Sequence, residues 1–133
     1  MTWVVVSIIR VTEVLEGEQT EFPIEETFVL LNFDTQDELN QKIQEQIDLI
    51  DAAGAEGVTY YGMPAKEYCL GVRKIKNIFN EAPLGENDPP GDETELTHSY
   101  MTVKTLSDAK LLAEGKAVQV NYIDDDPMEI ESA

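Results

Sequence analysis

The sequence predicts an α+β protein in which a single antiparallel sheet of four to five strands packs against one long helix, with a short second helix. Three observations predict this class. Residues 34–54 repeat apolar side chains at helical spacing, and several shorter segments are rich in β-branched and aromatic residues. Clusters of glycine, proline and acidic residues separate these segments.

The long helix is predicted at residues 35–53. Thr35 and Glu38 have the spacing of a capping box, in which each side chain satisfies a free amide of the first turn. Gly54 is typical of the position that follows a helix. Four aliphatic side chains are spaced four, four and three residues apart, which places them in one stripe that must face the sheet. These are Leu39, Ile43, Ile47 and Ile50.

Two strands are predicted on the N-terminal side of the helix. Residues 3–11 form an apolar, β-branched run, which indicates a central strand buried on both faces. Residues 13–26 are acidic and contain Gly17 and Pro23, so we expect a connecting loop there. Residues 27–33 form the second strand, and a hairpin with the first is the simplest pairing.

Three further strands are predicted after the helix. We expect residues 55–64 to be a loop with at most a short strand. Alternation in residues 66–80 predicts a half-exposed strand with a β-bulge near Lys74, because the buried parity changes there. Residues 96–103 are its expected hairpin partner. Thr105 and Asp108 cap a short helix that ends near Gly115, and residues 118–122 alternate as an edge strand.

The chain is predicted to be one domain at residues 1–123. A segment rich in proline, glycine and acids at residues 82–95 indicates a mobile loop, and residues 124–133 form an acidic tail that we expect to be disordered. The hydrophobic content of 42% is enough for a core. No apolar run approaches the ~20 residues that span a bilayer.

The charge of the chain is strongly negative. Its 27 acids and 9 bases give a formal net charge of −18, which disfavours direct binding to nucleic acid or to an anionic membrane. No leader pattern is evident, and Cys69 is the only cysteine, so we expect a cytoplasmic protein.

Few residues suit catalysis or metal binding. His98 is the only histidine, so one Cys and one His cannot form a closed zinc site. Cys69 and His98 can approach each other if their strands pair, but a buried core thiol explains Cys69 better. No glycine-rich phosphate loop is present. We therefore expect no metal or cofactor, and the balance is against an enzyme without excluding one.

Four parts of the chain carry a family pattern: Trp3, EETFVLLNFDTQDEL at residues 25–39, the YYG-initiated segment 60–79 and GDETELTHSY at residues 91–100. The order of these features resembles a small bacterial family known as domain of unknown function 4288. The resemblance covers about the first three quarters of the chain. It implies a fold and a bacterial source, and it implies no catalytic residues.

Two function hypotheses follow. In the first, the protein is a non-enzymatic interaction module whose acidic surface attracts a basic partner, as immunity proteins and charge-mimicking inhibitors do. Neutralising its loop acids should slow partner capture. These partner-binding candidates are Glu86, Asp88, Asp92 and Glu93.

The alternative is that the protein binds a small anionic ligand, or acts on one as an enzyme, at the basic strand 73–76. The site residues would then be Arg73, Lys74 and Tyr68. The bases of this strand can equally form internal ion pairs with the acids. A homodimer through the edge strand at residues 118–122 is a third, structural hypothesis.

Overall fold

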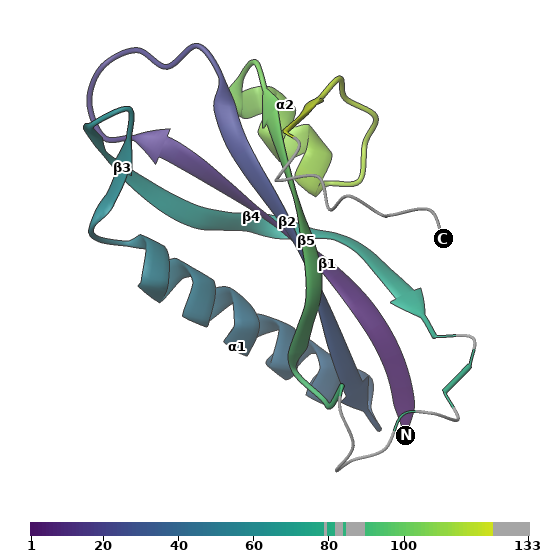
Figure 1. Cartoon of the computed structure of the whole chain (residues 1–133). Coiled ribbons are helices and arrows are strands. Elements are labelled where there is room, and N and C mark those ends of the chain that lie inside the picture. The colour runs from purple at the N-terminus through teal and green to yellow at the C-terminus, as the bar shows by residue number, and fades with distance from the viewer. Residues whose placement is uncertain (79, 82–83, 85–89, 124–133) are drawn as a thin grey trace, which may run out of the picture.

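In its described part the protein is an α+β structure with one curled antiparallel sheet of six strands and two helices (Figure 1). This computed structural model describes residues 1–78, 80–81, 84 and 90–123. The elements are β1 (Thr2–Val14), β2 (Phe22–Phe33), α1 (Gln36–Gly54), β3 (Val58–Tyr60), β4 (Met63–Asn77), β5 (Thr94–Val103), α2 (Leu106–Ala113) and β6 (Asn121–Ile123). The strands lie in the order β3-β4-β1-β2-β5-β6.

β1 and β2 form the centre of the sheet, as their apolar sequences predict. They make a hairpin without a register shift, from Thr2 opposite Phe33 to Val11 opposite Ile24. The loop predicted at residues 13–26 is wrong at both ends, because β1 extends to Val14 and β2 begins at Phe22. Acidic side chains are tolerated in these strand ends because internal bases pair with them.

α1 begins as predicted, because Thr35 Oγ1 accepts a hydrogen bond from the Glu38 amide at 3.2 Å and Glu38 accepts one from the Asp34 amide. The apolar stripe is less buried than expected. Leu39 is 3% exposed, whereas the three isoleucines of the stripe are only half-buried. The reason is position: α1 lies mainly over β4, near one side of the sheet.

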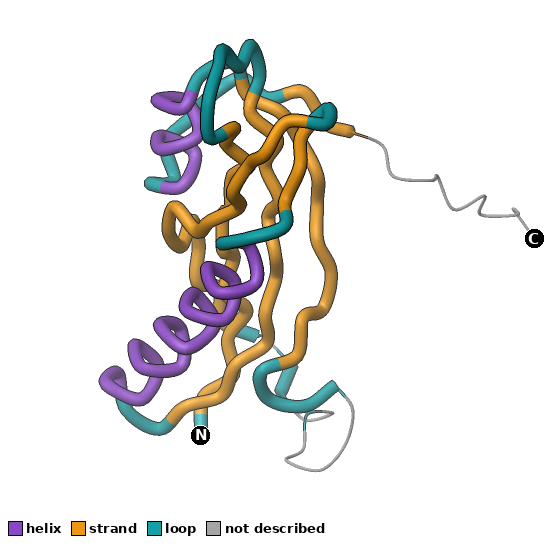
Figure 2. The backbone as a smooth tube through the Cα atoms, turned by 90° about the vertical axis from the view of Figure 1, so that its left-hand side faces the viewer, coloured by secondary structure: helices purple, strands orange, loops and turns teal. Residues whose placement is uncertain are grey.

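The core consists of two clusters that use alternate positions of β1. Val4, Val6 and Ile8 belong to the cluster under α1, whereas Ile9 and Val11 belong to the cluster under α2. Because successive residues of a strand point to opposite faces, the two clusters lie on opposite faces of β1. Figure 2 shows the two helices one above the other along the strands. Both helices lie on one side of the sheet in Figure 2, so the twist of the strands along their length turns the second face of β1 toward α2.

The predicted hairpin between the strands now named β4 and β5 is wrong. β4 pairs with β1, and β5 pairs with β2, so two strands separate them. Both edges of β1 and β2 are thereby hydrogen-bonded, as a strand buried on both faces requires. The predicted bulge is confirmed, because the register of β4 shifts at Arg73 and again at Leu70.

The sheet has more strands than the four to five predicted, because residues 58–60, in the segment expected to be a loop with at most a short strand, pair with β4 as β3. At the other edge, the strand predicted at residues 118–122 is shorter and lies later, since β6 covers only Asn121–Ile123. Val118 and Val120 instead pack onto the core cluster under α2.

Two predicted segments lie partly or wholly outside the described residues. These are the tail at residues 124–133 and half of the loop at residues 82–95, whose last two residues, Thr94 and Glu95, belong to β5. Neither α1 nor α2, the helices of the described part, has the length and apolar character of a membrane-crossing helix.

Candidate functional site

Arg73, the centre of the predicted anion site, is used inside the fold. Its Nη1 donates to the two carboxylate oxygens of Glu26 at 3.1 and 3.4 Å. Glu26 is 4% exposed and also accepts a hydrogen bond from the Ser7 hydroxyl. An anionic ligand would have to displace this buried carboxylate from the guanidinium group.

The other two residues of that predicted site have separate surroundings. Lys74 is exposed, and within the described part of the chain it makes no ion pair. Tyr68 packs against the core cluster under α2, and its hydroxyl lies 3.5 Å from Glu13 Oε2. Burial first, and then the negative charge of Glu13, raise the pKa of Tyr68. Arg73, Lys74 and Tyr68 therefore have three different surroundings.

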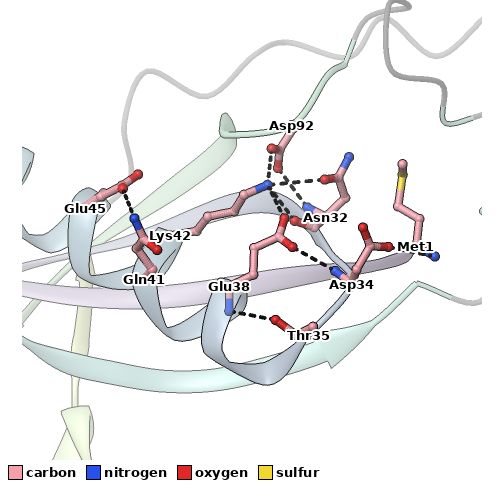
Figure 3. A network of polar contacts seen from close by, with 9 residues as sticks. All are labelled: Met1, Asn32, Asp34, Thr35, Glu38, Gln41, Lys42, Glu45 and Asp92. Carbon is pink, nitrogen blue, oxygen red and sulfur yellow. Dashed lines mark hydrogen bonds and ion pairs between the residues drawn. The ribbon is translucent and has the colours of Figure 1, made fainter.

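The predicted partner-binding acids divide into two groups. Glu86 and Asp88 lie outside the described residues. Asp92 is half-buried and lies in a polar network with α1 (Figure 3): its carboxylate accepts from Lys42 Nζ at 2.6 Å and from the Asn32 amide at 2.8 Å. Glu93 is exposed and is therefore available to a partner.

The Asp92 network also fixes the charge of Lys42. Burial alone lowers the pKa of this amine, but the hydrogen bond and charge of Asp92 and the charge of Glu38 outweigh it and raise the pKa. Lys42 further donates to the carbonyl oxygen of Asn32 at 2.7 Å. Asp92 is thus a structural anchor that attaches the end of the acidic loop to α1.

Cys69 and His98 do not form a catalytic pair. They lie on β4 and β5, with β1 and β2 between them, so three strand spacings of about 4.8 Å separate their backbones. Burial raises the pKa of the Cys69 thiol to about 11, which suits a core thiol rather than a nucleophile. Among the described residues, no group of three or more His, Cys, Asp or Glu is placed to hold a metal ion.

An exposed apolar surface beside acidic residues lies at the hairpin tips, at the end of the sheet away from the N-terminus (Figure 1). Here the β1–β2 loop meets the β3–β4 hairpin, and the Leu15 amide donates to the Pro64 carbonyl at 3.0 Å. A hollow of about 440 Å³ lies between them. We define the tip surface as Leu15, Glu16, Tyr60, Tyr61, Met63 and Pro64.

Local hydrogen bonds hold the β1–β2 loop in place. The Gln19 side chain accepts from the Val14 amide at 3.0 Å and donates to the Thr12 carbonyl at 2.9 Å. Gly17 takes a positive φ of 96°, which lets the loop turn back toward β2. Leu15 and Glu16 are therefore displayed on a loop that the chain itself fixes.

The tip surface combines aromatic rings with negative charge. The rings of Tyr60 and Tyr61 meet edge to face at 4.7 Å between centroids, and the Tyr60 hydroxyl lies 3.4 Å from Glu21 Oε1. Burial first, and then the charge of Glu21, raise the pKa of Tyr60. Glu16 and Glu18 are exposed, and neither makes an ion pair with another described residue. This surface can receive a cation beside an aromatic ring.

The sequence reasoning missed the tip surface, because it assigned residues 13–26 to a connecting loop and residues 55–64 to a loop with at most a short strand, and did not bring the two together. The available signal was Tyr61-Gly62, a two-residue connection between β-forming residues. Comparisons with protein-family models, with curated proteins and with solved structures find no match.

Proposed function

We propose that this protein is a non-enzymatic interaction module whose acidic surface engages a basic protein partner. The observation that supports this proposal most is how the fold uses its bases. Four of its bases pair with carboxylates of the chain itself, namely Arg10, Lys42, Lys66 and Arg73. The fold therefore neutralises the acids beside its core and leaves a large excess of acid on its surface.

This distribution suits the recognition of a basic surface. With a net charge of −18, the protein attracts a cationic partner over distances of about a Debye length and raises its association rate. Such steering adds speed and selectivity, while buried apolar and aromatic contacts supply most of the affinity. Inhibitors and immunity proteins that block a basic functional surface work in this way.

The ion pairs also count against the competing hypothesis of a small-anion site on β4. Glu26 already holds the Arg73 guanidinium, and Lys66 lies 3.6 Å from Glu13 Oε1 and 4.9 Å from the centre of the Tyr68 ring. An anion would compete with these carboxylates and would enter a strongly negative field.

The test begins with affinity capture from a lysate of the source cells at low and high salt, with bound proteins identified by mass spectrometry. The expected partner is basic, binds stoichiometrically and is lost at high salt. Its association rate with the purified chain should fall steeply as ionic strength rises. An association rate that does not depend on salt, or capture of acidic and neutral proteins alone, contradicts the proposal.

Charge variants then test which acidic residues raise the association rate with the partner. Neutralising Glu86, Asp88 and Glu93 to the amides, with Asp92 left intact as a structural anchor, tests the predicted loop. The matched control neutralises Asp37, Glu45 and Asp48 on the exposed surface of α1, which removes the same charge elsewhere. A larger fall in association rate for the loop variant supports its role, and equal falls remove it.

A further inference from the structure

Tyr61 is a bulky residue at a turn position that favours small or polar residues. It is 84% exposed and takes a φ of 48°, and Gly62 follows with a φ of 78°. Two consecutive positive φ values between the paired residues Tyr60 and Met63 define a hairpin turn of type I′. Asn, Asp and Gly are preferred at its first position, and a bulky residue there is strained.

Burial of the Tyr61 side chain does not offset the strain of its backbone. The Tyr61 ring contacts the Tyr60 ring edge to face, and most of its surface faces solvent. A strained, exposed aromatic residue on a hairpin is typical of a position that acts on something outside the chain.

An apolar hollow beside the β3–β4 hairpin provides a complementary surface. It is lined by Leu15, Glu16, Met63 and Pro64, and Leu15 is 58% exposed. Aliphatic side chains around a hollow, next in the chain to the exposed Tyr61, form the kind of small apolar centre that a partner side chain fills on binding.

The charge around this apolar centre selects its occupant. The loop between β1 and β2, residues 15–21, carries Glu16, Glu18 and Glu21 and no base. Glu21 already polarises Tyr60, and Glu16 lines the hollow. A cation over a tyrosine ring is favourable, and arginine is the cation that most often binds in this way.

We propose that the tip surface is the contact centre of the interaction described above. It binds an arginine or lysine side chain of the basic partner against Tyr61, while an adjacent apolar residue of the partner enters the hollow. This inference rests on the proposed function and adds the site and the chemistry of recognition.

The test is a titration of the full ¹⁵N-labelled chain, followed by NMR, with the peptide N-acetyl-Leu-Arg-Leu-amide at millimolar concentration. The expected result is saturable shifts at the amides of the tip surface, and a weaker affinity as salt rises. The neutral peptide with citrulline in place of arginine should bind about tenfold more weakly, because it lacks the charge.

Two variants separate recognition from folding. Tyr61→Asn places a preferred residue in the turn, so the fold should be kept while peptide affinity falls about tenfold. Leu49→Asn is the matched control, because Leu49 is also a large exposed apolar residue, 66% exposed, but lies on α1. It should leave peptide affinity unchanged.

The outcomes distinguish the two proposals. Shifts at the tip surface that Tyr61→Asn abolishes support both. Salt-dependent shifts confined to other acidic residues, or binding unchanged by Tyr61→Asn, overturn the site and leave the acidic interaction module standing. No shifts with the arginine peptide overturn the site, and the absence of any salt-dependent basic partner in the capture experiment overturns the module.

Discussion

Gly54, the last residue of α1, lies directly against the backbone of Glu67 on β4: a β-carbon placed on Gly54 would come 2.0 Å from the Glu67 carbonyl oxygen. The obstacle is backbone rather than a flexible side chain. The end of α1 can therefore approach the sheet this closely only with glycine at this position.

Gly54→Ala should accordingly destabilise the protein by about 3 kcal/mol or more, because either α1 or β4 must move. The measurement is urea unfolding followed by circular dichroism. Gly91→Ala is the matched control, since nothing lies within 4 Å of its β-carbon position and its φ is not in the left-handed region. That variant should be neutral or up to about 1 kcal/mol more stable. Equal stability of the two variants would contradict the close approach of α1 to β4.

Asp92→Ala should cost about 1–2 kcal/mol, because it leaves Lys42 and the Asn32 amide without their carboxylate acceptor. Glu93→Gln next to it should change stability by less than about 0.5 kcal/mol, since Glu93 is exposed. Chemical unfolding of both variants measures this difference. A neutral Asp92→Ala would mean that the network of Figure 3 does not hold the loop.

The same network predicts a pH dependence. Because the pKa of Lys42 is raised above its ordinary value of 10.5, its contribution to stability is fully present below pH 10.5. It is lost only as the pH rises through the folded-state value. The stability difference between the wild type and Lys42→Met should therefore stay constant from pH 6 to pH 9 in unfolding experiments, and a difference that shrinks across this range would contradict the raised pKa.

Arg73→Met should destabilise the protein by about 2–4 kcal/mol, because among the described residues it leaves the buried Glu26 carboxylate with only the Ser7 hydroxyl as a partner. The double variant Glu26→Leu, Arg73→Met removes both charges. It should be more stable than Arg73→Met alone, since no unpaired buried charge remains. A double-variant cycle in urea measures the coupling. Additive effects would show that the pair is not coupled.

Cys69 should react slowly with thiol reagents. Burial raises its pKa to about 11, so at neutral pH its thiolate fraction is about 100-fold lower than that of a thiol with a pKa of 9.0. Iodoacetamide labelling should speed up about tenfold per pH unit up to pH 10, with denatured protein as the control. Labelling of the folded chain at the denatured rate would disprove the shift.

Tyr61→Asn should raise stability by about 1 kcal/mol, because a bulky residue in the left-handed region is unfavourable by about 1–2 kcal/mol and Asn tolerates it better. Thermal unfolding measures the gain. Tyr61→Phe keeps the strain and serves as the comparison, so it should match the wild type. A loss of stability in Tyr61→Asn would show that Tyr61 serves the fold, which removes the structural reason for assigning it to recognition.

Local signals allowed much of the architecture to be predicted. The capping pair Thr35 and Glu38 marked the start of α1, and the parity change in β4 marked the bulge at Arg73. The apolar run of β1 correctly indicated a central strand. Each of these signals involves residues a few positions apart in the sequence. The local conformation of the backbone therefore sets their relative positions.

The candidate site was less predictable, because its parts come from separate segments. Leu15 and Pro64 are distant in the sequence and meet only where β1 and β4 pair. The sequence showed where the bases of this strand lie. The structure shows that Arg73, one of these bases, pairs with Glu26 inside the fold. Charge composition shows how many acids exceed the bases and does not show which bases are already paired.

The sequence by itself determined the α+β class, the long capped helix, the central hairpin and the acidic excess, since spacing and composition carry these properties. Only the tertiary structure decided that β4 pairs with β1 and β5 with β2, that Asp92 and Arg73 are internal partners, and that the two hairpin tips meet. The physical reason is that strand pairing and burial of charge depend on satisfying every backbone and charged group of the interior together. No local pattern specifies that arrangement.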